Sequence, residues 1–154
     1  MKRDLHFRHA TSADLPDIVR MLADDDLGRQ REHYKLPLPE PYLAAFVEIE
    51  QNPYNELVVA ELDSRVVGTL QLIFIPSISF QGGLRAQVES VRVELDLRGR
   101  GIGSKMMEWA MERARQRGAY VMQLTTHNTR KEAHRFYEQL GFKGTHLGMK
   151  ISLK

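Results

Sequence analysis

Residues 91–104 read Val-Arg-Val-Glu-Leu-Asp-Leu-Arg-Gly-Arg-Gly-Ile-Gly-Ser. Three glycines at alternate positions, Gly99, Gly101 and Gly103, lie between a strand-like run and the helical pattern of 102–117. Glycine adopts backbone angles that other residues avoid and lets an anion approach the main chain closely. The first turn of the following helix offers unpaired N–H groups. The stretch therefore predicts a site for phosphate or pyrophosphate, with a tight strand-to-helix turn as the structural alternative.

The sequence on either side predicts a central sheet with helices packed against it. Apolar residues recur at period two in some segments and at helical spacing in others. Hairpins pair antiparallel strands and crossover helices join parallel ones, so the expected fold class is α/β with a mixed α+β sheet. We expect strands at 5–7, 56–62, 66–75, 84–93, 120–125 and 147–153, helices after Thr11, near Pro41, at 102–117 and from a Thr129/Glu132 capping box to Gly141, and irregular connections at 24–39 and 76–83.

The composition excludes several kinds of chemistry. The chain has 154 residues and no cysteine, so it has no disulfide, no Cys-ligated zinc, no iron–sulfur cluster and no cysteine nucleophile. No run of about 18 apolar residues is present, and the N-terminal sequence lacks the apolar region of a secretory signal. We expect one domain covering residues 1–154, cytoplasmic, with no membrane partner and no metal site.

The formal charge is distributed unevenly along the chain. Residues 1–77 contain 8 basic and 13 acidic residues, whereas residues 78–154 contain 14 basic and 7 acidic ones, which together give +2. A basic second half suits an anionic partner such as a phosphorylated cofactor, and solvated surface charge is the alternative. Nucleic acid is not expected, because the basic residues alternate with Glu and form no patch with aromatic residues.

Three known loop patterns can be compared with the glycine-rich stretch. The dinucleotide pattern G-x-G-x-x-G fails because Ser104 stands at its last position, and Gly103-Ser104-Lys105 has the wrong order for a Walker A loop. Arg98-x-x-Gly101-x-Gly103 instead resembles the pyrophosphate loop of the GNAT superfamily of N-acetyltransferases. A second block resembles the same superfamily: Asn128, Ala133, Phe136-Tyr137 and Gly141-Phe142 stand in its order and spacing.

The resemblance implies a fold, a co-substrate and a reaction. The fold would be a mostly antiparallel central sheet that is splayed at the cofactor site, with helices on both faces. The reaction would be direct transfer of the acetyl group of acetyl-CoA to a primary amine in a ternary complex, and a non-catalytic acyl-CoA-binding or regulatory module is the alternative. The implied cofactor contacts are Val91, Arg92, Val93, Arg98, Gly99, Arg100, Gly101, Ile102, Gly103, Ser104 and Asn128.

The same resemblance suggests two catalytic residues. Acetyl transfer needs a neutral amine and a proton for the departing thiolate. Glu89 is the candidate base, acting directly or through water, with a solvated strand residue as the alternative and Glu94, expected to be solvated, as second choice. Tyr137 of the Phe-Tyr pair is the candidate general acid, with a core tyrosine capping a backbone group as the alternative.

The acceptor amine cannot be read from any motif. We expect it to be a small molecule or a peptide, shaped by residues 24–54 and 76–83. The acidic run Asp24–Asp26 either attracts a cationic amine or forms a solvated loop. Residues 94–97 lack the proline or aromatic residue often found before such loops, so the loop's entry geometry stays open. Dimers are common among the proteins that this sequence resembles, which leaves a homodimer open.

Overall fold

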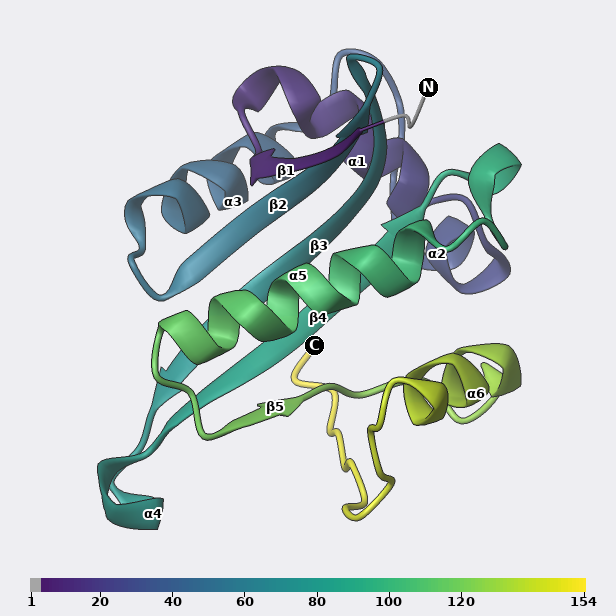
Figure 1. Cartoon of the computed structure of the whole chain (residues 1–154). Coiled ribbons are helices and arrows are strands. Elements are labelled where there is room, and N and C mark those ends of the chain that lie inside the picture. Colours follow the sequence, from purple (N-terminus) through teal and green to yellow (C-terminus); the bar gives the residue numbers. More distant parts are fainter. Residues whose placement is uncertain (1–3) are drawn as a thin grey trace.

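The computed structural model of the protein describes residues 4–154. The expectation about the N-terminal sequence rests partly on residues 1–3, which lie outside the described range. A five-stranded sheet forms the centre of the molecule, in the order β1-β2-β3-β4-β5, with antiparallel pairs up to β4 and a parallel pair between β4 and β5 (Figure 1). The strands are β1 (Leu5–His9), β2 (Asn55–Leu62), β3 (Arg65–Pro76), β4 (Leu84–Val93) and β5 (Val121–Gln123). The predicted mixed sheet is confirmed.

Helices cover both faces of the sheet (Figure 1). Helices α1 (Leu15–Leu22) and α3 (Glu40–Gln51) pack on one face around the buried residues Ile18, Met21 and Phe46. Helix α5 (Ile102–Gln116) covers the other face, and α6 (Lys131–Gln139) packs against the same hydrophobic cluster. The short elements are η1 (Ser12–Asp14), α2 (Asp26–Arg31), α4 (Ser79–Gly82) and η2 (Leu95–Leu97).

Helix α5 follows its sequence pattern closely. Its buried face consists of Ile102, Met106, Met107, Ala110 and Ala114. Trp109 is partly buried and stacks on Phe7 of β1, with 5.6 Å between ring centroids. Gly118 follows the helix with a φ of 81°, the left-handed conformation that favours glycine at a helix C-terminus. Met106, Met107 and Trp109 therefore have a structural role, because they pack α5 against the sheet.

The start of α1 is also as predicted. Thr11 and Asp14 form a capping box around η1, and Asp14 accepts hydrogen bonds from the Arg8 guanidinium at 2.6 and 3.0 Å. The hydrogen bond from Arg8 lowers the pKa of Asp14, although partial burial opposes the shift. Arg8 also donates to Glu61, so one side chain ties β1 to both η1 and β2.

Three local predictions are wrong. Residues 24–39 are not wholly irregular, because Asp25 caps the short helix α2. The Thr129/Glu132 capping box does not form: the Thr129 hydroxyl bonds to His127 Nδ1, and α6 begins after Arg130. The helical spacing of Tyr42, Ala45, Phe46 and Ile49 predicts that all four share the packed face of α3, but Ala45 is exposed, so this buried face is narrower than predicted.

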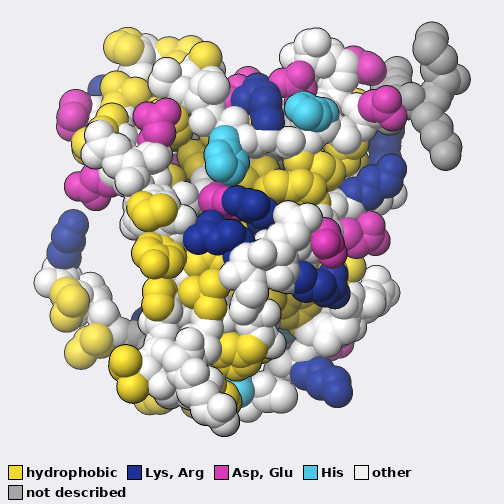
Figure 2. Space-filling view, turned by 60° about the vertical axis from the view of Figure 1, so that its left-hand side comes forward, with side chains coloured by type: hydrophobic (Ala, Val, Ile, Leu, Met, Phe, Trp, Pro, Cys, Tyr) yellow, Lys and Arg dark blue, Asp and Glu magenta, His cyan; other side chains and the backbone are white. Residues whose placement is uncertain are grey.

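The closing strand at 147–153 is likewise absent. Its apolar residues alternate as expected, but the segment pairs with no strand in the described part of the chain. The apolar side chains whose alternation predicted a strand therefore stay largely exposed in the described part of the chain (Figure 2).

Candidate active site

A β-bulge in β4 shapes the site. In the pairing of β3 with β4, Thr69 lies opposite Arg92 and Gln71 lies opposite Glu89, so Ser90 and Val91 share one partner position. Ser90 has a φ of 54°, which is unusual for a residue other than glycine. A bulge adds one residue to a strand and changes which side chains share a face.

The bulge brings Glu89 to the same face of the sheet as Arg92. Ala86 and Val88 before the bulge, and Val91 and Val93 after it, all pack into the cluster beneath α5. Because side chains alternate along a strand on either side of the bulge, Glu89 and Arg92 both point to the opposite face. A regular strand would place residues three apart on opposite faces.

Past Gln87, one edge of β4 has no strand partner. Pairing with β5 covers only Arg85–Gln87 against Val121–Gln123, so within the described residues β5 does not follow β4 beyond the bulge. The Val91 carbonyl accepts a hydrogen bond from Arg92 Nη1 at 3.0 Å, and the Val93 carbonyl accepts one from Arg98 Nε at 3.1 Å. This unpaired edge is the splay implied by the resemblance, and it can accept an extended ligand as an added strand.

The glycine-rich loop connects β4 to the N-terminus of α5. Gly99 and Gly101 have φ values of 77° and 81°, and a Cβ at either position would meet no atom within 4 Å. The backbone conformation therefore favours glycine at both positions, and the space that a side chain would occupy is open. The first-turn N–H groups of α5 begin immediately after Gly101, so the loop fits a pyrophosphate group.

At Gly103, close packing rather than a positive φ accounts for the glycine. A Cβ there would lie 3.3 Å from Phe136 Cζ and 3.8 Å from Val93 Cγ2. The missing side chain thus lets the first turn of α5 approach α6. The neighbouring Ser104 is half-buried, whereas Arg100 is exposed.

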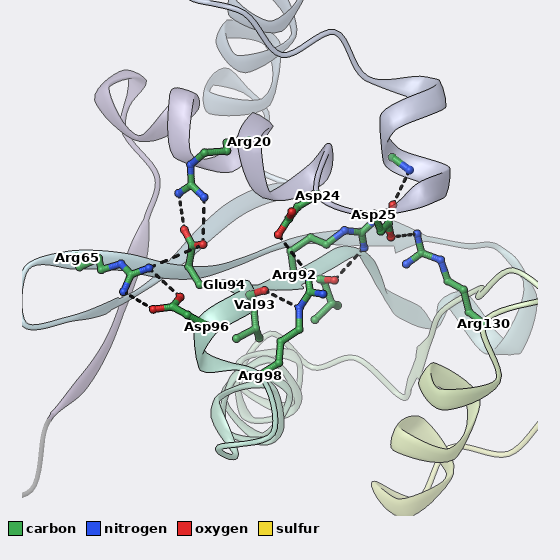
Figure 3. Close-up of polar contacts among 12 residues, drawn as sticks. Arg20, Asp24, Asp25, Arg65, Arg92, Val93, Glu94, Asp96, Arg98 and Arg130 are labelled. Atoms are coloured by element: carbon green, nitrogen blue, oxygen red, sulfur yellow. Dashed lines mark hydrogen bonds and ion pairs between the residues drawn. The ribbon is translucent and has the colours of Figure 1, made fainter.

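Ion pairs, one of them to the buried Glu94, anchor the start of the loop. Glu94 is buried and accepts two hydrogen bonds from Arg20 of α1, with Arg65 Nη2 3.9 Å away (Figure 3). Arg65 also donates to both oxygens of Asp96 at 2.9 and 3.1 Å. The hydrogen bond to Glu94 raises the pKa of Arg20. The prediction that Glu94 is solvated is wrong: this carboxylate holds the loop to α1 in the absence of a proline.

The acidic turn between α1 and α2 contacts the opposite side of the site. Asp25 Oδ2 lies 2.5 Å from Arg130 Nη2 and 3.9 Å from Arg92 Nη2, and Asp24 lies 3.6 Å from Arg98 (Figure 3). Asp25 also accepts a hydrogen bond from the Gly28 backbone. Partial burial alone would raise the pKa of Asp25, but the Gly28 N–H and the charge of Arg130 outweigh it and lower that pKa. A solvated loop is therefore the wrong interpretation for Asp24 and Asp25, whereas the Asp26 side chain is exposed.

The Arg92 side chain is mostly buried, but its hydrogen-bond donors are not all paired. Its side chain is 14% exposed, and its Nε is buried without a hydrogen-bond partner. Burial lowers the pKa of Arg92, and the charges of Arg130 and Arg31 act in the same direction. Arg92 and Arg130 thus both lie within 4 Å of the Asp25 carboxylate, and Arg31 adds a third positive charge that acts on it. Arg130 was not predicted from the sequence, where it appears only as one of many basic residues in the second half.

Tyr137 lies beside this positive charge. Its ring makes edge contacts with Phe136 and Phe142, at centroid distances of 5.1 and 5.8 Å. Burial raises the pKa of the phenol, while Arg92 and Arg130 act to lower it. Its hydroxyl has no hydrogen bond to any described residue, so it does not cap a backbone group. A neutral phenol that experiences the positive charge of two guanidinium groups is suited to donate a proton.

Glu89 ends a short chain of polar side chains. Gln123 Nε2 donates to Gln87 Oε1 at 2.8 Å, and Gln87 Nε2 donates to Glu89 Oε1 at 2.5 Å. Glu89 is half-buried, with one carboxylate oxygen oriented by Gln87. This position differs from that of a fully solvated strand residue.

Asn128 and the neighbouring histidines lie before α6. Asn128 is exposed, and its side chain makes no hydrogen bond within residues 4–154. His127 bonds to Thr129, and His134 Nε2 lies 3.0 Å from the His127 carbonyl oxygen. Within the described residues no group of three His, Asp or Glu side chains is arranged to hold a metal, and no helix is long and apolar enough to cross a membrane.

The fold and this site define an acetyl-CoA-dependent N-acetyltransferase. The chain belongs to the acetyltransferase (GNAT) family, whose model matches residues 19–142. It is 28% identical over 139 residues to the aminoalkylphosphonate N-acetyltransferase of Salmonella typhimurium, covering 90% of this chain and 85% of that protein.

Two solved structures extend the comparison. A Bacillus halodurans C-125 protein named as a transcriptional regulator is 49% identical, with a TM-score of 0.94, covering 97% of this chain and all of that one. A Clostridium acetobutylicum protein solved with acetyl-CoA shares the fold at 19% identity, with a TM-score of 0.75 and 97% coverage of both chains.

Replacing Gly101 with alanine tests the pyrophosphate loop. A methyl group there would project into the open space where phosphates approach, so we expect CoA to bind about tenfold or more weakly by calorimetry, a loss of about 1.4 kcal/mol per tenfold. Gly118→Ala is the matched control, because Gly118 has the same φ of 81° and equally open surroundings at the far end of α5. Equal CoA affinity in the wild type and both variants would contradict the assignment.

Proposed function

We propose that residues 1–154 act as one domain that transfers acetyl from acetyl-CoA directly to the primary amine of a small molecule carrying an anionic group. The observation that carries the proposal is the position of Arg92. It lies on the same face of β4 as Glu89 and is close enough to Tyr137 for its charge to affect that phenol. One site thus offers a carboxylate for an amine and arginines for an anion.

The amine must lose a proton before it attacks. A lysine-like amine has a pKa of about 10.4, so its neutral form costs roughly 4–5 kcal/mol at pH 7. Glu89 can accept that proton directly or through water, and the hydrogen bond from Gln87 orients its carboxylate. The acceptor then attacks the thioester carbonyl, whose developing negative charge can be met by N–H groups on the unpaired edge of β4.

The thiolate of CoA leaves as the new amide forms. We infer that Tyr137 donates its proton to this thiolate, and the charges of Arg92 and Arg130, which act on the phenol, favour the negative charge that remains. Because the chain has no cysteine, an acetyl-thioester intermediate on the protein is not available. This supports direct transfer within a ternary complex of protein, acetyl-CoA and amine.

The arginines favour an acceptor that bears a carboxylate, phosphate or phosphonate. Arginine presents a planar set of donors that matches such groups, and Arg92 has a buried Nε without a partner. The Salmonella typhimurium relative is named for an amine that also carries a phosphonate. That name supports the same chemical class for the acceptor of this protein.

Glu89→Gln tests the base. We expect kcat/KM to fall about a hundredfold near neutral pH, with a smaller loss towards pH 9 because more of the amine is already neutral in solution. The assay is CoA thiol release over about pH 6 to 9, with Glu108→Gln, an exposed carboxylate on α5, as the control. An unchanged profile would rule out the base role.

Tyr137→Phe tests the acid. Because burial holds the pKa of this phenol above its usual value near 10, it stays protonated at neutral pH, and losing the hydroxyl should reduce kcat about a hundredfold. The affinity for CoA should stay within about twofold, and Tyr54→Phe, which removes an exposed phenol, should change neither. Equal losses in kcat and in CoA affinity would instead indicate a structural role.

Arg92→Gln tests the acceptor class. Glycine is compared with glycinamide, and aminoethylphosphonate with ethanolamine. The first member of each pair carries an anionic group in addition to its amine, and the second does not. We expect the wild type to prefer the anionic member, and the variant to lose about 10- to 100-fold in kcat/KM on that member, as for a charged hydrogen bond worth about 1.5–3 kcal/mol. The loss on the neutral member should be less than about twofold. Arg29→Gln, which removes an exposed charge paired with Asp26, is the control.

The outcomes separate the parts of the proposal. Turnover of neutral amines without any anionic preference would overturn the acceptor class and leave acetyl transfer standing. A parallel loss of CoA affinity in Arg92→Gln would show that this arginine serves the cofactor's phosphates. CoA binding without CoA release from any amine would indicate a non-catalytic acyl-CoA-binding module.

A further inference from the structure

Asp25, in the turn between α1 and α2, lies where the anionic group of the acceptor is expected to bind. Its Oδ2 is 2.5 Å from Arg130 Nη2 and 3.9 Å from Arg92 Nη2 (Figure 3). An aspartate carboxylate is itself an anion of the kind that guanidinium groups bind well. The chain therefore supplies a carboxylate of its own beside the two arginines proposed to recognise the carboxylate or phosphonate of an acceptor.

The two carboxylate oxygens of Asp25 have different partners. Oδ1 accepts a hydrogen bond from the Gly28 backbone N–H and so caps the N-terminus of α2. A Cβ on Gly28 would lie 2.0 Å from the Leu22 carbonyl oxygen and 2.7 Å from Asp25 Oδ1, so the turn closes this tightly only with glycine. The local backbone thus holds Asp25 by one oxygen and leaves the other oxygen for the arginines.

The contact with Asp25 leaves hydrogen-bond donors of Arg92 free. A distance of 3.9 Å makes Arg92 Nη2 an ion-pair neighbour of Asp25 but is too long for a hydrogen bond. Arg92 Nε is buried without a partner, and Nη1 donates to the Val91 carbonyl oxygen. A buried donor without a partner costs free energy. An external anion that reaches Arg92 can therefore make hydrogen bonds that Asp25 does not make.

We propose that Asp25 is a specificity-determining residue, because its carboxylate competes with external anions for Arg92 and Arg130. Repulsion from this fixed negative charge weakens the binding of every anion at the arginines. An anion without an amine, such as inorganic phosphate, has only the arginine contacts to offset the repulsion. An anionic amine has the same contacts and also places its amine at Glu89, on the same face of β4 as Arg92.

Asp25 thereby restricts the site to ligands that carry both groups. This inference rests on the anionic acceptor of the proposed function. The negative charge is present at neutral pH: partial burial alone would raise the pKa of Asp25, but the Gly28 N–H and the charges of Arg130, Arg92 and Arg31 lower it.

Asp25→Asn removes the charge with little change in shape. Asparagine is as good an N-cap as aspartate, so its side-chain oxygen can still accept the hydrogen bond from Gly28 and cap α2. Asp26→Asn is the matched control, because Asp26 is the next residue, is 92% exposed and pairs with Arg29. Each variant removes one negative charge, so only the position of the lost charge differs.

Calorimetry with methylphosphonate, an anion without an amine, tests the competition directly. CoA is kept at saturating concentration so that the glycine-rich loop is occupied. We expect Asp25→Asn to bind methylphosphonate about tenfold or more tightly than the wild type, because a like charge next to the ligand is removed. Asp26→Asn should stay within about twofold of the wild type. A residue that only held the turn together would give the opposite sign, so equal or weaker binding by Asp25→Asn overturns the proposal.

Steady-state kinetics gives an independent readout of the same competition. In Asp25→Asn, methylphosphonate should inhibit at about tenfold lower concentration, and the KM for aminoethylphosphonate should fall while the KM for ethanolamine stays within about twofold. Circular dichroism verifies that the variant is folded. If Asp25→Asn does not fold, Asp25→Ser takes its place, since serine also caps a helix and carries no charge.

The outcomes separate this inference from the proposed function. A wild type that prefers anionic amines, together with an uncharged Asp25 variant that shows no gain for methylphosphonate, overturns the role of Asp25 and leaves the acceptor class standing. A wild type without any preference for anionic amines overturns the acceptor class and the role of Asp25 with it.

Discussion

The β-bulge at Ser90 is the constraint on which the site depends. Without the extra residue, Glu89 and Arg92 would lie on opposite faces of the sheet, and the carboxylate for the amine would be separated from the arginine for the anion. With it, Val91 and Val93 still pack beneath α5 while both polar side chains face the other way. β5 also stops following β4 just before the bulge. The bulge at Ser90, where φ is positive, thus coincides with the shared polar face of Glu89 and Arg92 and with the free edge of β4.

Ion pairs between distant parts of the chain hold the surrounding loops. Glu94 connects the glycine-rich loop to α1 through Arg20, and Asp25 connects the turn before α2 to Arg130 before α6. Buried charges are costly unless they are paired, so these contacts restrict which loop arrangements are compatible with the folded state. The loop's position is consequently a property of the whole tertiary structure.

Local pattern was sufficient for most of the fold. The strand 84–93 and the helix from Ile102 were predicted at their observed starts, because period-two and helical spacing there agree with the glycine signals. The prediction failed where a tertiary partner decided the outcome. Thr129 bonds to His127 and so does not cap α6, and the alternating residues of 147–153 find no strand partner among residues 4–154.

The same distinction explains what could be predicted of the site. The glycine-rich loop and Tyr137 belong to short motifs, so they were identifiable from sequence. The contact between Asp25 and Arg130 joins residues 105 positions apart, which no local pattern reveals.

The uneven charge of the two halves was the one available signal for this contact. Acidic residues of the first half, including Asp24, Asp25 and Glu56, pair with arginines of the second. This pairing accounts for part of the imbalance, and the charges of Arg92 and Arg130 act on the phenol of Tyr137.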